Sequence, residues 1–113
     1  MKGNIEKVLA KTCDVFGVSA EDIRSNKHNR NVFFARVVVA KHLRTLFPLS
    51  STEIGQILCK DHSTVLRYLS VYDQEYRYNK EFRIFADKTK DIDLEIKSDL
   101  HEELEDELFE IIG

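Results

Sequence analysis

The chain has 113 residues, of which 42% are hydrophobic, with four glycines, one proline and a formal net charge of −3. This length suits one domain that buries its own core, and the composition favours a mostly helical globule. No stretch approaches the roughly 20 apolar residues of a membrane span, and no apolar signal segment opens the sequence, so we expect a cytoplasmic protein without a membrane anchor. Cys13 and Cys59 are far apart, which predicts neither zinc nor a disulfide framework.

The net charge hides a strong segregation along the chain. Residues 24–67 contain eight Lys and Arg against Glu53 and Asp61, a balance of +6. Residues 91–113 contain ten Asp and Glu against Lys97, a balance of −9. Such asymmetry indicates a basic surface for phosphates and a separate acidic segment.

The N-terminal part predicts two helices. Apolar residues at helical spacing favour a helix over residues 4–16, and Gly17 stands where a left-handed residue ends helices. Ser19 and Asp22 then fit a capping box, which begins a short second helix.

A basic loop and a long helix are expected next. Residues 24–31 contain no apolar side chain, so they predict a solvated loop. Residues 32–47 show apolar positions three and four apart, which favours a helix buried on one broad face.

Residues 50–67 then predict a helix-turn-helix. Ser50 and Glu53 form a second capping box, and Asp61 can cap the following helix. Ser63 and Thr64 then occupy its exposed first turn, where a recognition helix presents short polar side chains to DNA. A capped helical hairpin in an ordinary bundle fits the same geometry. No breaker interrupts residues 61–85.

The C-terminal third predicts further helix, with an interruption at residues 91–93 left open. The predicted helix is rich in acidic residues and has an apolar stripe along one side, formed by Ile96, Leu100, Leu104, Leu108 and Ile112. Such a stripe packs on its own domain or binds a partner or second copy, and both readings stay open. The expected fold is therefore an all-α small helical bundle, with a DNA-binding domain over 1–90 and an acidic amphipathic helical extension over 91–113.

Residue identity adds a family resemblance. Residues 61–66, Asp-His-Ser-Thr-Val-Leu, resemble the Asp-His-(Thr/Ser)-Thr-Val signature of the DnaA C-terminal domain, which binds the origin boxes of bacterial chromosomes. Residues 15–25 and 53–55 are similar to that family too, as are Arg30 and Arg36. The resemblance covers roughly residues 4–90.

The resemblance implies a set of DNA contacts. The expected base-reading residues are Asp61, His62, Ser63 and Thr64. The expected backbone or minor-groove contacts are Lys27, His28, Arg30, Arg36, Arg44, Lys60 and Arg67. Arg36 and Arg44 are predicted to clamp phosphates from the side of their helix that faces away from Val38 and Val39.

Three departures from the family bear on which DNA sequence is bound. His28 stands where the family often has an arginine, and Ser51-Thr52 replaces a frequent Leu-Pro. The turn before Asp61 is one residue shorter. The chain also lacks a G-x-x-x-x-G-K-[ST] phosphate loop, so no ATPase activity is expected.

The sequence therefore predicts sequence-specific binding of double-stranded DNA, in a replication accessory or transcriptional regulator of bacterial or mobile-element type. The alternative is a protein-interaction module that acts through its acidic C-terminal helix. No catalytic residues, metal site or cofactor are expected, and the oligomeric state is left open. His42 and His101 are expected to be surface or capping residues.

Overall fold

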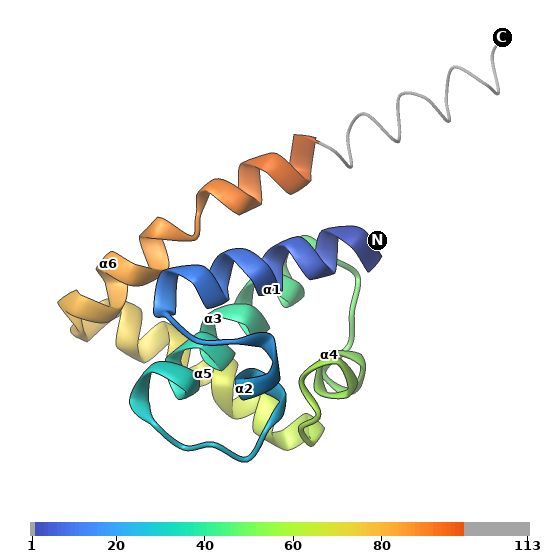
Figure 1. Ribbon diagram of the computed structural model, residues 1–113, viewed down its shortest axis with the longest axis horizontal. Coiled ribbons are helices and arrows are strands. Elements are labelled where there is room, and N and C mark those ends of the chain that lie inside the picture. The colour runs from blue at the N-terminus through green and yellow to red at the C-terminus, as the bar shows by residue number, and fades with distance from the viewer. Residues whose placement is uncertain (1, 99–113) are drawn as a thin grey trace, which may run out of the picture.

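The computed structural model describes residues 2–98, and within this range every regular element is helical (Figure 1). The expected small all-α bundle is confirmed. Its helices are α1 (Lys2–Phe16), α2 (Ala20–Arg24), α3 (Arg30–Leu46), α4 (Ser51–Leu58), α5 (His62–Tyr78) and α6 (Lys80–Lys88). After a turn at residues 89–90, the chain is helical again over 91–98. None of the helices in residues 2–98 is long and apolar enough to cross a membrane.

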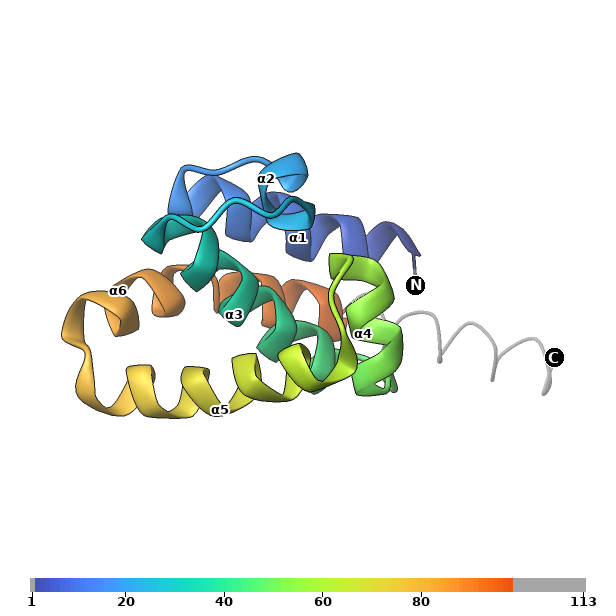
Figure 2. The same cartoon turned by 90° about the horizontal axis from the view of Figure 1, so that it is seen from below.

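Helix α3 is the centre of the bundle. Figure 2 shows it running between α1 and α2 on one side and α5 on the other, and it also contacts α4. Four consecutive residues, Val37 to Ala40, have no exposed surface. Toward its ends the helix keeps an exposed side, which includes Arg30, Asn31, Arg44 and Thr45. The expected broad buried face is therefore present, and in the middle of α3 other elements cover the helix on every side.

The predicted helix ends near the N-terminus are confirmed. Ser19 and Asp22 form the reciprocal capping box of α2, and Gly17 has a φ of +68°. The start of α3 lies two residues earlier than expected, because the Asn29 side chain accepts a hydrogen bond of 2.9 Å from the Val32 N–H.

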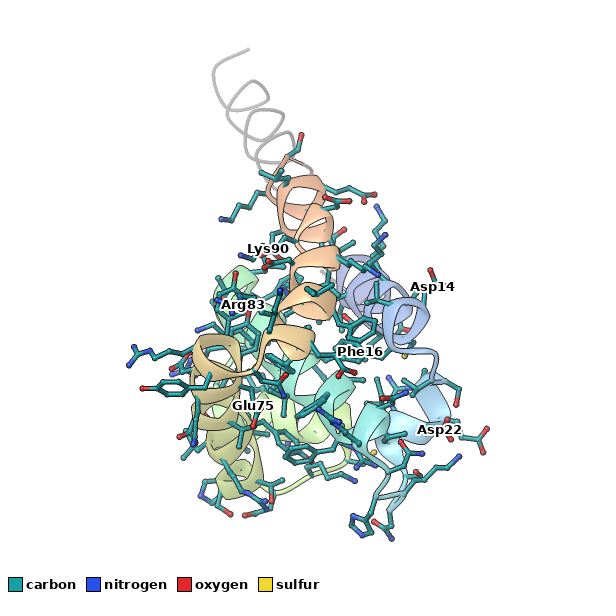
Figure 3. All side chains as sticks on the ribbon, turned by 90° about the vertical axis from the view of Figure 1, so that its left-hand side faces the viewer. Asp14, Phe16, Asp22, Glu75, Arg83 and Lys90 are labelled. Atoms are coloured by element: carbon teal, nitrogen blue, oxygen red, sulfur yellow. The ribbon has the colours of Figure 1, made fainter. Side chains whose placement is uncertain are left out.

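A break between α5 and α6 was not predicted. Asn79 leaves helical geometry and accepts a hydrogen bond from the Phe82 N–H, which caps α6 and lets the chain turn back alongside α5. This reversal buries Phe82 against Tyr72, with ring centroids 5.6 Å apart. It also sets Phe85 against Phe16 of α1, with ring centroids 5.7 Å apart; Figure 3 shows Phe16 at the side of the helices that follow α5.

The first part of the acidic C-terminal segment belongs to the core. Ile92 is 4% exposed and Ile96 is fully buried, both within the main hydrophobic cluster. For residues 91–98 the structure therefore agrees with a helix that packs on its own domain. Leu100, Leu104, Leu108 and Ile112, like His101, lie outside the described residues.

His42 joins this segment to α3, so its expected surface or capping role is wrong. Its ring is 4% exposed. Its Nδ1 lies 2.6 Å from Asp93 Oδ1, and its Nε2 lies 2.7 Å from Thr89 Oγ1. The Thr89 hydroxyl donates to the Ala86 carbonyl, which leaves its oxygen to accept from His42. Both ring nitrogens thus have partners across the joint between α3 and residues 89–93.

We expect Asp93→Ala to lower the free energy of unfolding by about 1–3 kcal/mol, because it leaves a buried ring nitrogen without a partner. Urea or thermal unfolding measures this loss. The matched control is Glu95→Ala, since Glu95 lies in the same segment and forms an exposed 3.9 Å pair with Lys7; its loss should stay within about 0.5 kcal/mol. Equal unfolding curves for the two variants would contradict the role given to His42.

Candidate nucleic-acid interface

The two helices of the predicted helix-turn-helix, α4 and α5, meet at a tight turn. Cys59 ends α4 in the left-handed region, with a φ of 57°, and the Lys60 N–H bonds to the Gly55 carbonyl at 2.8 Å. A Cβ atom at position 55 would collide with the Lys60 carbonyl oxygen. Gly55 therefore lets the turn pack directly on α4, which fixes the position of α5 relative to it.

Asp61 caps α5, as the sequence predicted. Its carboxylate accepts hydrogen bonds from both the backbone N–H and the hydroxyl of Ser63. Both hydrogen bonds lower the pKa of Asp61, and the bond from the hydroxyl has the larger effect. Because the Ser63 hydroxyl uses its hydrogen to donate to Asp61, its oxygen is left to accept a hydrogen bond from the surroundings.

The four expected base-reading residues lie together at the start of α5, but their exposure differs. Asp61, His62 and Ser63 are exposed, whereas Thr64 is half-buried. The His62 ring lies 3.4 Å from Asp61 in a fully solvated pair. The first turn of α5 is therefore accessible to a ligand.

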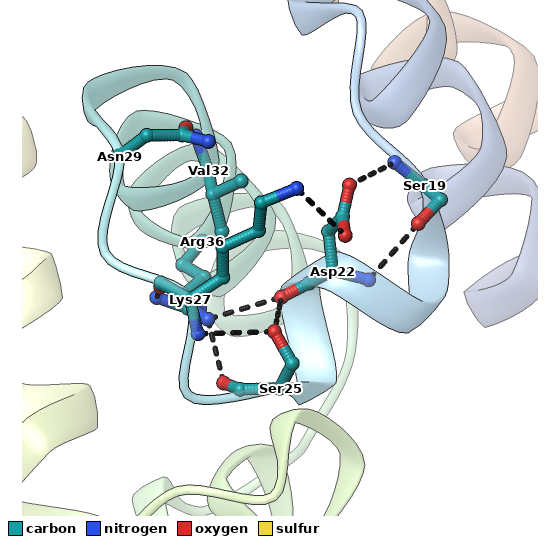
Figure 4. A network of polar contacts seen from close by, with 7 residues as sticks. All are labelled: Ser19, Asp22, Ser25, Lys27, Asn29, Val32 and Arg36. Carbon is teal, nitrogen blue, oxygen red and sulfur yellow. Dashed lines mark hydrogen bonds and ion pairs between the residues drawn. The ribbon is translucent and has the colours of Figure 1, made fainter.

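The basic loop between α2 and α3 is held by the buried Arg36. The Arg36 guanidinium donates to the Ile23 carbonyl at 2.8 Å. It also donates to the carbonyls of Lys27, Asp22 and Ser25, at 2.7, 3.0 and 2.6 Å (Figure 4). It thus supplies donors to carbonyls at the end of α2 and in the loop, where helical partners run out; the Asp22 carbonyl also accepts from Ser25. The positive charge also suits the C-terminal end of a helix.

This anchoring overturns the prediction that Arg36 clamps a phosphate. Arg36 is only 2% exposed, so its guanidinium is not available to DNA. Arg44 is exposed, as expected, and makes one hydrogen bond of 3.2 Å to the Leu49 carbonyl. Residues eight apart on an α-helix are rotated by about 80°. Arg36 therefore points into the bundle while Arg44 points to solvent.

Lys60 connects the loop to the helix-turn-helix. Its Nζ donates to the Ser25 carbonyl at 2.7 Å, the same oxygen that accepts from Arg36. Burial is the main cause that lowers the pKa of Lys60, and the nearby positive charge of Arg36 lowers it further. Two cations share one acceptor here, so the turn before α5 and the basic loop are held together at a site of positive potential.

The basic loop and α5 line a hollow of about 320 Å³. Phe33 and Tyr68 meet edge to face, with centroids 5.8 Å apart, and contribute an aromatic wall. The polar lining comes from both elements: Asn26, His28, Arg36, Lys60, Thr64 and Arg67. The structure thus brings His28, Lys60, Thr64 and Arg67 together around one site.

The remaining candidate cations are placed by separate contacts. The Lys27 ammonium pairs with Asp22 at 3.5 Å, and the Arg30 guanidinium lies 5.2 Å from the centre of the Phe34 ring. Arg67 lies 5.8 Å from the centre of the Phe33 ring. These side chains are exposed or partly so, and their contacts orient them without neutralising Arg30 or Arg67.

Sequence reasoning missed three residues of this surface. Phe33 and Tyr68 were not among the expected contact residues, yet both line the hollow. Leu66 was passed over as part of the family signature, but 51% of it is exposed on α5. Its position one turn after His62 was the available signal.

Comparison with known proteins identifies relatives of this chain, and the family match includes the residues of this surface. The sequence model described as "Bacterial dnaA protein helix-turn-helix" matches residues 5–70. The chromosomal replication initiator protein DnaA of Gloeobacter violaceus is 41% identical over 70 residues, covering 61% of this chain and 16% of that protein.

Two further relatives are also chromosomal replication initiator proteins. The Thermosipho africanus protein is 32% identical over 65 residues, covering 58% of this chain and 15% of its own length. DnaA 1 of Chlamydia pneumoniae is 29% identical over 99 residues, covering 88% of this chain and 21% of its own length. The chain thus spans only about a sixth to a fifth of these relatives.

Arg36→Ala should lower the free energy of unfolding by about 3 kcal/mol or more. It removes the side-chain donor of the Ile23 and Lys27 carbonyls and opens space in a buried part of the bundle. Arg44→Ala is the matched control: the same charge is removed from the same helix with one exposed hydrogen bond, so the loss should stay below about 1 kcal/mol. Urea unfolding of both variants measures the difference. Equal losses would show that Arg36 does not anchor the loop.

Proposed function

Because the chain belongs to the family of bacterial DnaA helix-turn-helix domains, whose members bind DNA, we propose that it binds duplex DNA sequence-specifically. The first turns of α5 enter the major groove, and the loop of residues 26–30 approaches the adjacent minor groove. The hollow between them faces the sugar-phosphate backbone. This division follows the general rule that contacts with base edges determine which DNA sequence is bound, whereas contacts with phosphates orient the protein on the duplex.

The observation that most supports this proposal is the shared Ser25 carbonyl. It ties the basic loop, through Arg36 and Lys60, to the turn that precedes α5. Loop and recognition helix therefore face the same side as one unit. A duplex presents its two grooves on either side of a phosphate strand, and a fixed pair of elements around a basic hollow is complementary to that arrangement.

The hydrogen bonds at the start of α5 favour particular base contacts. Ser63 presents an acceptor oxygen, which suits the amino group of cytosine or adenine in the major groove. His62 is exposed and can pack its ring on a thymine methyl group or bond to a base edge. Thr64, being half-buried and beside the hollow, is better placed for the backbone strand.

The role we propose is that of a replication accessory or transcriptional regulator, acting on DNA in the cytoplasm without ATP hydrolysis. It rests on the family and on the absence of a phosphate-loop motif from these 113 residues. The relatives' own names describe replication initiators. Since the chain spans a small part of them, origin melting is not included in the proposal.

The alternative, a protein-interaction module, relies on the acidic C-terminal helix. In residues 91–98 the apolar positions 92 and 96 are already covered by the bundle, while Leu94 is 74% exposed. That leaves one large apolar side chain for a partner within the described part of this segment. DNA binding is therefore the function that the described residues support better.

Duplex binding should weaken with salt. If about five phosphates are neutralised, log K should fall against log salt with a slope near −4 to −5. Titrations of a labelled duplex at several salt concentrations, followed by fluorescence anisotropy, give the slope. A flat salt response, or no binding to any duplex pool at low salt, would contradict the proposal.

The same titrations locate the phosphate contacts. Arg67→Gln, beside the hollow, should flatten the slope by about one unit. Arg77→Gln removes the same charge from an exposed position on α5 about 15 Å further along the helix, and its slope should equal that of the unmodified chain. A slope changed by Arg77→Gln and not by Arg67→Gln would place the DNA on the wrong end of α5.

Base reading has its own signature. His62→Ala should weaken binding to the preferred duplex by about 1–3 kcal/mol and relax base preference at one position. Selection of bound sequences from a random pool, with the unmodified chain and with the variant, measures both effects. An equal loss on all sequences would mean that His62 does not read a base.

A further inference from the structure

We propose that Leu66 reads a thymine, by packing its side chain on the 5-methyl group in the major groove. This inference rests on the proposed function and adds a specificity determinant to it. None of the expected contact residues includes Leu66, so the assignment comes from its exposure and position on α5.

The exposure of Leu66 is the first observation. Among the described residues the large exposed hydrophobic side chains are Leu66, Tyr78, Ile84 and Leu94, with Leu66 51% exposed. Of these four, Leu66 alone lies in the first two turns of α5. Covering a half-exposed apolar side chain lowers the free energy of the complex. A partner that binds this face of α5 is therefore stabilised by contact with Leu66.

Helical geometry places Leu66 within the proposed DNA-facing side. Val65 and Tyr68 are buried and define the side of α5 that faces the bundle. At 100° per residue, Leu66 points about 130° away from the middle of that side. It lies one helical turn from Ser63 and one turn from Ser70, which are also exposed. It stands about 6 Å along the helix axis from His62, so the two can meet neighbouring base pairs in the same groove.

The chemistry of the groove selects the ligand atom. A leucine side chain has no donor or acceptor, and covering the polar edge of a base with it costs desolvation without a compensating bond. The thymine methyl group is the apolar feature that the major groove offers. Contact there favours thymine over cytosine, which has a hydrogen atom at that position and an amino group beside it.

Removing the methyl group from DNA and the side chain from the protein tests the contact. The preferred duplex is first selected with the full chain, and each thymine is then replaced by deoxyuridine, one at a time. For the unmodified chain we expect one replacement to weaken binding about fourfold, the value of one methyl-sized group. Leu66→Ala should bind the thymine duplex about tenfold more weakly and be indifferent to that same replacement.

Two variants control for side effects. Ile84→Ala removes a similarly exposed apolar side chain from α6, 47% exposed, and should keep both affinity and sensitivity to deoxyuridine. Leu66→Met retains apolar reach and should keep the sensitivity in part. Circular dichroism of Leu66→Ala should match that of the unmodified chain, since alanine favours helix and the position is exposed.

The outcomes separate this inference from the proposed function. If no duplex binds the unmodified chain, the proposed function fails and the inference fails with it. If duplex binding is sequence-specific but Leu66→Ala retains its sensitivity at every thymine, the inference alone is overturned. An equal loss of affinity for Leu66→Ala on selected and unrelated duplexes also overturns it, because a thymine contact predicts loss at one position.

Discussion

The interaction on which the candidate interface depends is the burial of the Arg36 guanidinium among four backbone carbonyls. Moving a cation out of water costs several kcal/mol, and hydrogen bonds of good geometry must offset that cost. The carbonyls at the end of α2 and in the loop provide them, and in turn receive the donors that they lack. A loop without apolar side chains cannot form a core of its own, so Arg36 gives it a defined position. That position brings His28 into the same hollow as Arg67.

The parts of the structure that could be predicted from the sequence are those decided within a few residues. The capping boxes that begin at Ser19 and Ser50, and the Asp61 cap, all join a side chain to a backbone N–H two or three residues away. Contacts between distant parts of the chain were missed for the complementary reason. The partners of Arg36 lie up to 14 residues away, and Thr89 lies 47 residues from His42. Spacing on one helix cannot indicate such partners.

Two errors show how a local pattern misleads. Arg36 and Arg44 were treated as equivalent because both are cations on α3, yet the rotation between them sends one inward and the other outward. Asn79 was passed over because neither Pro nor Gly interrupts residues 61–85. Its short amide side chain competes well for a backbone N–H, and burial of Phe82 against Tyr72 rewards the resulting reversal. In both places tertiary contacts decided between local options, and the same kind of contact makes residues 91–98 part of the core.

Figures 1 and 3 place residues 91–98, which contain three acidic residues against Lys97, at the opposite end of the bundle from the basic loop and the α4–α5 turn. The central claim is that loop and turn form one DNA-binding surface. Backbone amide NMR shifts recorded while a selected duplex is added test it most directly. The account predicts that the large changes fall together on residues 26–30 and on the first turns of α5, with α6 and residues 91–98 unaffected. Changes centred on α6 or on residues 91–98, with the loop unaffected, would contradict it.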